Sequence, residues 1–378
     1  MAFLNKNTAL AVAALVACGS AAATEDYDLR YAPGYGAADM SAPFEGGWVF
    51  QAHTYAYSGN IRGTTAVQLP FSTIHALNPA VPAIPGAFTT TTVDTNEQIN
   101  VYGLLPRLSY MSSTTFLGAT IGGTVLIPLV NKKSNATITS ASTIATSPLP
   151  AGNNTAIAAG VHPLVVGQVQ GVANANSNSD WGTGDLEFSP ILRWSTENTQ
   201  TLFVLTTVTP TGDYDKNRAA NPSAGKFWTF RPAVQFSYIG DGWDVGTRLA
   251  YSYNTRNTET KYKSGSYLNL DLALMKSVSE STRIGVSGYA VDQLNKDTTS
   301  LKTDADYVAT FGAANAAVAE AREETTLDQK GRVFGIGPEI AYIHGAGDYL
   351  LEGRIMKEFG SQTRPKGFTA FVTLSKPF

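Results

Sequence analysis

The fold is decided by residues 226–238, which have the sequence KFWTFRPAVQFSY. Every second position carries a large apolar residue or a proline, namely Trp228, Phe230, Pro232, Val234, Phe236 and Tyr238. The positions between them carry Thr229, Arg231, Ala233, Gln235 and Ser237. Because successive side chains of a β-strand point to opposite faces, this period of two predicts a strand with one face suited to hydrocarbon and the other suited to water.

The same alternation recurs in residues 185–195, 242–254 and 267–277. With weaker segments included, the sequence predicts twelve strands, near 47–58, 98–110, 115–128, 184–195, 200–210, 226–238, 242–254, 266–277, 282–294, 331–343, 348–359 and 367–378. Long and short connections alternate between them. Bacterial outer-membrane barrels have an even number of strands, long external loops and short periplasmic turns. We therefore expect an all-β protein, with an antiparallel up-and-down transmembrane β-barrel over residues 47–378.

The composition also favours a membrane protein over a cytosolic enzyme. Charged residues make up 15% of the 378 positions, whereas about 25% is usual in soluble domains. The net charge is −3 and no run of Lys or Arg occurs, so nucleic acid is not an expected partner. The longest apolar stretch after the N-terminus, residues 118–130, is shorter than the roughly 18 residues of a spanning helix and contains a proline. Such a chain crosses a bilayer only as a closed sheet.

Residues 1–23 have the pattern of a secretory signal peptide. A positively charged start is followed by an apolar run from Thr8 to Cys18 and then by small residues. Cleavage after Ala23 would leave residues 24–46 as an irregular leader, which either plugs the lumen or hangs in the periplasm. The alternative is a lipoprotein signal, in which Cys18 would be acylated. We expect export to the outer membrane of a Gram-negative bacterium.

Charged residues of the predicted strands fall on the parity opposite to the apolar one. An ionised group on the lipid face would cost about 2–4 kcal/mol at the midplane, so these residues are expected inside. The predicted pore-lining set is Glu187, Arg193, Arg231, Arg248, Asp271, Arg283, Glu339, Glu352, Arg354 and Glu358. Two interpretations stay open: a charged, water-accessible conduit that selects solutes, and an internal ion-pair network that fills a narrow barrel. Both interpretations can be true at different heights along one barrel.

Aromatic residues near both ends of the predicted strands fit the two interfacial girdles of a membrane barrel. They are Trp228 and Tyr253 on the external side, and Trp194, Tyr238 and Trp243 on the periplasmic side. The core of a soluble sandwich is the alternative, because aromatic residues are common in any sheet. Phe378 ends the last predicted strand, as is usual for such barrels. We expect outer-membrane lipid and, through Phe378, the barrel-assembly machinery as partners.

The regions outside the predicted strands are of two kinds, polar loops and an acidic, Ala-rich segment. Residues 132–180 are rich in Ala, Asn, Ser and Thr with little charge, and residues 60–97 combine Thr and Pro, so we expect surface loops. These loops either fold into the mouth of the barrel and narrow it or are plain solvated loops. Residues 304–324 are acidic and rich in Ala, and they predict a short external helix.

Four prolines fall inside predicted strands, where a closed barrel offers no free edge, so each is expected to mark a bulge or a kink. They are Pro106, Pro190, Pro232 and Pro338.

The sequence predicts no metal, no cofactor and no disulfide. The four histidines are scattered and the one cysteine, Cys18, leaves with the signal. Residues 213–217 imitate the start of a calcium loop, but Arg218 stands where glycine is needed and Ala224 where the closing glutamate is needed. An outer-membrane lipid hydrolase with a Ser-His pair on the outer wall remains an alternative, with His53 as its histidine. No Gly-x-Ser-x-Gly motif accompanies it.

Five sequence blocks resemble the meta-pathway phenol-degradation family of outer-membrane proteins. They are PTGDYDKN (210–217), FWTFRP (227–232), YNTRN (253–257), YKSG (262–265) and KGRVFGIGP (330–338). The resemblance covers most of residues 180–378, whereas the regions 60–97 and after Val130 are enlarged here. It implies a porin-like channel, not an enzyme, that admits small aromatic or hydrophobic compounds.

We therefore expect passive uptake of phenol-like molecules. The arginines of the predicted set would lend the pore a positive potential that favours phenolates or carboxylates, and the carboxylates would set the opposing field. A structural or adhesive barrel with a sealed lumen is the remaining alternative.

Overall fold

The structure is a computed structural model that describes residues 29–39 and 46–378, except 314, 317, 318, 321, 322, 324–326, 328 and 346. The predicted signal peptide, residues 1–23, and both alternatives for its cleavage lie outside the described residues. The same holds for residues 24–28 and 40–45 of the predicted leader.

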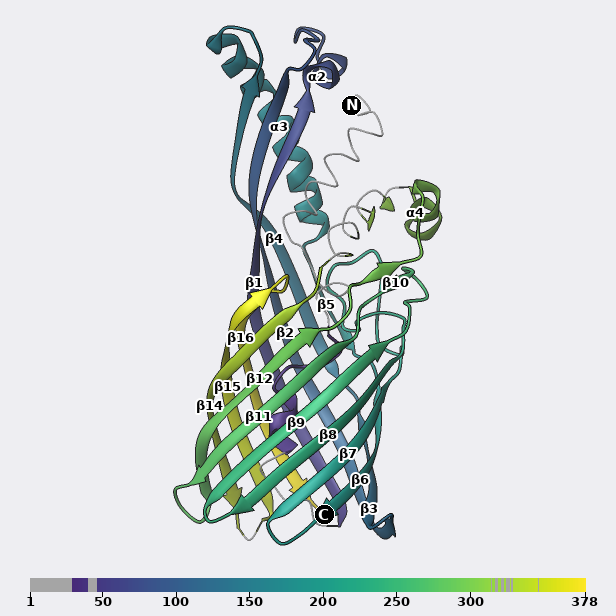
Figure 1. The fold of residues 1–378 in the computed structure, drawn as a ribbon, viewed down its shortest axis with the longest axis vertical. Coiled ribbons are helices and arrows are strands. Elements are labelled where there is room, and N and C mark those ends of the chain that lie inside the picture. The colour runs from purple at the N-terminus through teal and green to yellow at the C-terminus, as the bar shows by residue number, and fades with distance from the viewer. Residues whose placement is uncertain are drawn as a thin grey trace.

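Twelve antiparallel strands close into a barrel within the part of the chain that the structure describes (Figure 1). They are β1 (Gly47–Pro70), β2 (Phe88–Phe116), β3 (Ala119–Leu126), β6 (Glu187–Ser195), β7 (Thr199–Val208), β8 (Thr229–Gly240), β9 (Trp243–Asn254), β11 (Tyr267–Ser277), β12 (Thr282–Gln293), β14 (Arg332–His344), β15 (Tyr349–Gln362) and β16 (Lys366–Pro377). Each pairs with its neighbours along the chain, and β1 closes the ring by pairing with both β16 and β2. The predicted fold class is confirmed.

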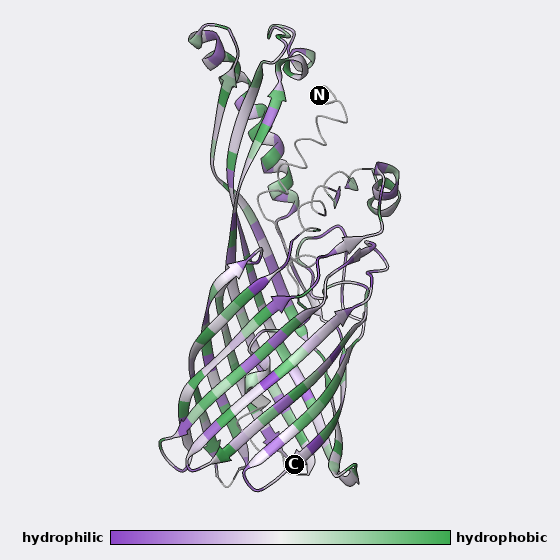
Figure 2. Cartoon of the chain, viewed as in Figure 1, coloured by the Kyte–Doolittle hydropathy of each residue, from purple (hydrophilic) through white to green (hydrophobic). Residues whose placement is uncertain are grey.

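The period of two separates an apolar outer surface from a polar lumen. In β8, Phe230, Val234 and Phe236 are exposed, whereas Arg231 and Gln235 are buried. Figure 2 shows the resulting alternation of hydrophobic and hydrophilic residues around the wall. The five aromatic residues predicted for the girdles, Trp194, Trp228, Tyr238, Trp243 and Tyr253, have this outward parity and lie near strand ends. Their role as girdles stays a prediction.

Short turns join the strands at the end of the barrel that holds the C-terminus (Figure 1). Residues 117–118, 196–198 and 241–242 form such turns, and this end is the periplasmic one by the usual rule for these barrels. The external connections are longer, with one exception. The connection 363–365 has only three residues, because β15 and β16 extend further than predicted.

The four strand prolines do not shift the register, so the predicted bulges are wrong. Pro190 pairs with Gly123 of β3, whereas the pairing of β6 with β7 skips from Phe188 to Ile191 in the same register. Each of the other three prolines, Pro106, Pro232 and Pro338, likewise pairs with one neighbour and leaves a gap in the ladder to the other, again with the register kept. The reason is that a residue in an antiparallel sheet donates its N–H to only one neighbouring strand.

Three strands continue outward beyond the barrel and form what we call the extension, residues 61–97 and 135–175 (Figure 1). The pairing of β1 with β2 runs without a break to Pro70 and Phe88, and β4 (Leu129–Thr146) pairs with the outer part of β2. The helix α2 (Phe71–Leu77) lies at the tip. Surface loops were predicted here, which is wrong, because the Thr-rich segments have the high strand propensity that such a sheet requires.

The helix α3 (Ala151–Ala175) covers one face of the extension. Its Val161, Val165 and Val169 recur every four residues, so they share one side of the helix, and they pack with Val67 and Val93 of the sheet. By length and composition alone, α3 would also qualify as a membrane-spanning helix. Its buried contacts place it on the extension.

The remaining elements are short and external. They are β5 (Asn178–Thr183), β10 (Tyr262–Lys263), β13 (Thr298–Thr299) and α4 (Asp304–Phe311). The helix α4 lies where the sequence predicts one, although it ends earlier than residue 324.

Candidate functional site

The leader segment, residues 29–39, lies inside the barrel. Arg30 forms a buried ion pair with Asp185 (Nη2 to Oδ2, 2.8 Å) and donates to the carbonyl oxygens of Gly225 (2.5 Å) and Phe227. Asp185 lies just before β6, and Gly225 and Phe227 lie just before β8, so these partners come from two external connections. The N-terminal end of the segment is therefore fixed to the barrel by a charge and by directed hydrogen bonds, which are roughly twice as strong as neutral ones.

The middle of the leader segment is held by the buried carboxylate of Asp271. The Tyr31 hydroxyl donates to Asp271 Oδ2, and the Gly34 amide donates to Oδ1 at 3.0 Å. Arg231 donates to the carbonyl oxygen of Arg30, and Arg354 donates to that of Tyr35 at 3.4 Å. Three charged wall residues thus bind the leader segment.

Two glycines let the segment approach the wall closely. Gly34 has φ +86°, a left-handed conformation that strains other residues, and a Cβ added there would lie 2.3 Å from Met356 Cε. A Cβ on Gly36 would lie 2.5 Å from Asp271 Oδ2. From Tyr35 to Asp39 the chain forms the 3₁₀ helix η2.

The leader segment separates two cavities in the lumen. The periplasmic cavity has a volume of about 700 Å³ and the external cavity about 180 Å³. Tyr35, Leu126 and Glu187 line both, so they mark the boundary between the cavities. A solute that crosses the barrel along its axis must pass this boundary.

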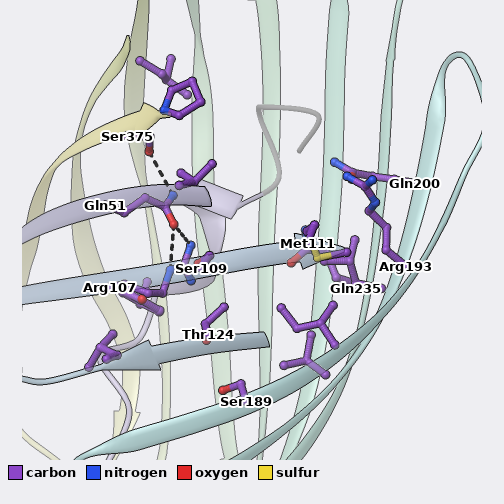
Figure 3. A pocket seen from close by; sticks show the side chains of 18 of the residues that line it. Gln51, Arg107, Ser109, Met111, Thr124, Ser189, Arg193, Gln200, Gln235 and Ser375 are labelled. Atoms are coloured by element: carbon purple, nitrogen blue, oxygen red, sulfur yellow. Dashed lines mark hydrogen bonds between the residues drawn. The ribbon is translucent and has the colours of Figure 1, made fainter. Parts of the chain in front are cut away.

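The periplasmic cavity has a polar and positively charged wall. Four arginines line it against two glutamates, namely Arg107, Arg193, Arg248 and Arg283 against Glu187 and Glu280. Figure 3 shows how Gln51 links Arg107 to Ser375: Arg107 Nε donates to Gln51 Oε1 (2.8 Å), and Gln51 Nε2 donates to Ser375 Oγ (3.0 Å). Arginines outnumber glutamates along this wall, and one of them, Arg283, is paired with Asp244 (2.5 Å).

The external cavity has a different character, because aromatic and aliphatic side chains dominate its wall. They include Tyr31, Tyr35, Tyr55, Tyr57, Ile99, Val101, Leu105 and Val208. Six charged residues also line it, namely Arg30, Lys132, Asp185, Glu187, Glu358 and Arg364. The Tyr57 hydroxyl donates to Glu358 (3.1 Å), which also accepts from Tyr289 (2.8 Å). Small-molecule sites in proteins commonly combine an apolar wall with a few polar groups in this way.

The wall beside the external cavity contains an interruption. The pairing of β4 with β5 stops at Leu129 and Thr183, and that of β3 with β6 begins at Leu126 and Glu187. Between these pairs, residues 184–186 on one side oppose residues 127–128 on the other. The amide of Gly184 donates to the carbonyl of Pro128 at 2.8 Å. Pro128, Gly184 and Asp185 line the external cavity at this point.

All ten predicted pore-lining residues have the inward parity of their strands and are buried or half-buried. Ion pairs join members of the set, among them Arg231 with Glu187 (3.5 Å) and Arg354 with Glu339 (3.2 Å). Arg193, Arg248 and Arg283 line the periplasmic cavity, Glu358 the external cavity, and Glu187 both. Arg231, Asp271, Glu339, Glu352 and Arg354 line neither cavity. The set therefore combines an ion-pair network at one height with a charged cavity at another, and its role in transport stays a prediction.

Other lumen residues were missing from the predicted set. Arg107 follows Pro106 in a predicted strand, and the parity rule applied there would have found it. Asp244 pairs with Arg283 at 2.5 Å and also has inward parity. Arg30 and Asp185 meet only through the fold, so no local pattern signals them.

The structure places His53 inside the barrel rather than on its outer wall. His53 is 0% exposed, its Nδ1 lies 3.0 Å from Thr373 Oγ1, and its ring contacts Tyr35 with centroids 4.7 Å apart. A hydrolase on the outer wall requires a histidine that lipid can reach. This position does not provide one.

A comparison with protein families gives one match. The family described as "Putative MetA-pathway of phenol degradation" matches residues 84–374. The chain belongs to this family. The match confirms the resemblance of the five sequence blocks, and it begins well before them.

One solved structure has a fold similar to that of this member of the family. The COG4313 outer membrane channel from Pseudomonas putida F1 has a TM-score of 0.56 and 13% identity, over 90% of this chain and 98% of that chain. At this identity the similarity establishes the fold.

Two further structures have lower scores and support no argument. The CymD monoaromatic hydrocarbon channel has a TM-score of 0.38 and 8% identity, over 89% of each chain. A Pseudomonas aeruginosa FadL homologue has a TM-score of 0.37 and 8% identity, over 96% of this chain and 98% of that one. No curated protein gives a significant match.

Proposed function

We propose that the chain is a passive outer-membrane channel for small aromatic compounds, with no catalytic step and no cofactor. The observation that carries the proposal is the external cavity, which is lined by four tyrosines and several aliphatic side chains and borders directly on the leader segment. The membership of a family named for phenol degradation and the fold of an outer-membrane channel support it.

The size of the external cavity fits one aromatic ring. Its volume is about 180 Å³, and an apolar protein cavity of about 150 Å³ binds benzene. Tyrosine rings offer edge-to-face and offset contacts to such a ring, and the polar groups at Tyr57 and Glu358 offer partners to a phenolic hydroxyl. The arginines of the periplasmic cavity would then favour a solute that carries or gains a negative charge.

Uptake of radiolabelled phenol and benzoate by cells that carry or lack the gene tests the proposal. We expect faster uptake with the gene at low external concentration, where a channel limits flux. Equal rates in the two strains would refute it. A barrel that acts only as a structural or adhesive surface would give that equal result, and the extension would then be its working part.

The path past the leader segment has a separate test. Ala37 of η2 packs against Ala273 of β11, and the predicted mature chain has no cysteine, so Ala37→Cys with Ala273→Cys gives a unique pair for a disulfide. If solute passes along the axis, oxidation should stop uptake and reduction should restore it. Uptake that persists after oxidation would instead show that solute leaves sideways, through the wall interrupted at Pro128 and Gly184.

A further inference from the structure

Three basic residues lie on the lipid-facing side of neighbouring strands at the external end of the barrel. Arg332 of β14, Lys357 of β15 and Lys366 of β16 have the same outward parity as Phe334, Phe359 and Phe368. Lys357 Nζ lies 5.9 Å from the centre of the Phe368 ring, and Arg332 Cζ lies 5.8 Å from that of Phe334. Figure 1 shows the three strands side by side in one part of the wall.

Of these three basic residues, Lys357 is the one whose positive charge most needs an anionic partner. Because β15 runs outward, Lys357 lies on the membrane side of Phe359, which is 52% exposed on the lipid-facing side near the external end. A lysine at this depth must extend its ammonium group toward the interface. None of the three basic residues forms an ion pair with a carboxylate of the described chain. Asp292 lies opposite Arg332 in the pairing of β12 with β14, but the two side chains form no ion pair.

The basic group has no counterpart on the opposite part of the wall. The outward positions of β7, β8 and β9, which lie across the barrel, carry no charged residue within the strands as described. Three neighbouring strands span about 10 Å at the usual spacing of about 4.8 Å. The basic group is therefore wide enough for more than one phosphate.

An apolar groove lies below the basic group on the same strands. Gly353 and Ala370 form its floor, and Ile340, Ile355 and Val372 form its sides. Gly353 lies four residues from Lys357, about 13 Å along the strand. A Cβ on Gly353 would contact only Ile340 Cγ2, at 3.8 Å, so the space above this glycine is open.

We infer that this wall binds one phosphorylated glycolipid of the outer leaflet. Its phosphates lie against Arg332, Lys357 and Lys366, and one acyl chain lies in the groove over Gly353 and Ala370. Charge complementarity selects the head group, since phosphate is anionic and the patch is basic. The spread over three strands favours a diphosphorylated sugar over a phospholipid with a single phosphate.

Native mass spectrometry of the purified full-length barrel, with added diphosphorylated lipid A or phosphatidylglycerol, tests this site. We expect one lipid A to stay bound to the wild type and phosphatidylglycerol to bind at least tenfold more weakly. The variant Arg332→Gln/Lys357→Gln/Lys366→Gln should lose at least tenfold in lipid A affinity, and Lys357→Gln alone should lose several-fold. Equal lipid A binding by the wild type and these variants, or equal binding of both lipids by the wild type, would overturn the inference.

Two further variants separate the head group from the chain. Gly353→Leu fills the groove and should weaken lipid A binding several-fold without a change of charge; unchanged binding would remove the groove from the site. Lys263→Gln is the matched control, because Lys263 also lies over an aromatic ring at the external end, with Nζ 4.8 Å from the centre of the Tyr253 ring, but does not line the groove. It should bind lipid A as the wild type does, and a loss equal to that of Lys357→Gln would refute a specific site.

Discussion

Gly34 lies against Met356 at the centre of the barrel, with room for a hydrogen but not for a methyl group between them. A Cβ on Gly34 would lie 2.3 Å from Met356 Cε and 3.2 Å from the Tyr289 ring, and the φ of +86° adds strain. We predict that Gly34→Val detaches the leader segment from the wall and raises the single-channel conductance in planar bilayers severalfold. Gly86→Val is the control, because Gly86 has φ +77° and nothing within 4 Å of its Cβ position. Unchanged conductance in Gly34→Val would show that the segment does not block the pore.

The ion pair of Arg354 and Glu339 should respond differently to one change and to two. Both side chains are 0% exposed, and their atoms lie 3.2 Å apart. Arg354→Met leaves a buried carboxylate without this partner, so we expect a loss of about 3–5 kcal/mol of stability. Arg354→Met with Glu339→Leu removes both charges and should recover most of that loss. Urea unfolding followed by tryptophan fluorescence measures both, and two additive losses would contradict the expected coupling.

The arginines of the periplasmic cavity should set the ion selectivity of the open barrel. In the Gly34→Val background, the reversal potential in a KCl gradient should indicate a preference for chloride, because four arginines face two glutamates in this cavity. Adding Arg107→Gln and Arg193→Gln should reduce that preference or invert it. A reversal potential that does not move would remove these two residues from the conduction path.

A large side chain in the external cavity should slow solute uptake without unfolding the barrel. Val101 lines this cavity, so Val101→Trp should occupy much of its 180 Å³ and reduce phenol uptake at least fivefold. Val125→Trp is the control, because Val125 is 39% exposed on the outer surface, where tryptophan is tolerated. Equal uptake by the two variants would mean that the cavity is not on the route.

The helix α4 should lose stability in acid through its N-terminal cap. Hydrogen bonds from the Lys302 amide, the Thr303 hydroxyl and the Thr303 amide hold the pKa of Asp306 below its usual range. A carboxylate with a lowered folded-state pKa stabilises the helix above its unfolded pKa of about 3.9, and this contribution is lost as the pH falls through the folded value. Hydrogen exchange of residues 304–311, corrected for intrinsic rates, should show less protection near pH 3 than near pH 6. Asp306→Asn should remove most of that difference.

The barrel was predictable because the alternation of apolar and polar residues along each strand shows which side chains face the lipid and which face the lumen. The alternation in residues 226–238 reproduces the burial of β8 position by position, and the same rule placed Arg248 and Glu352 inside. The extension was not predictable in this way. Its threonine-rich strands look like polar loops until α3 covers one face, and the contact of Val165 with the sheet exists only in three dimensions.

The contacts of the leader segment were equally out of reach. The hydrogen bond of Tyr31 with Asp271 spans 240 positions, and no local pattern encodes such a distance. The sequence showed a charged residue of inward parity at Asp271, but not that this charge is used to hold the chain's own N-terminal part.

The unbroken pairing of β1 with β2 limits how the surface of this protein can diversify. From Gly47 and Met111 to Pro70 and Phe88 the two strands keep a single register, so the wall dictates which side of the extension faces α3. Inserting one residue into either strand would turn its valines toward water and its polar side chains toward the helix. The extension can therefore become longer only if residues are added in pairs to both strands. Each added pair moves its tip outward by about 7 Å.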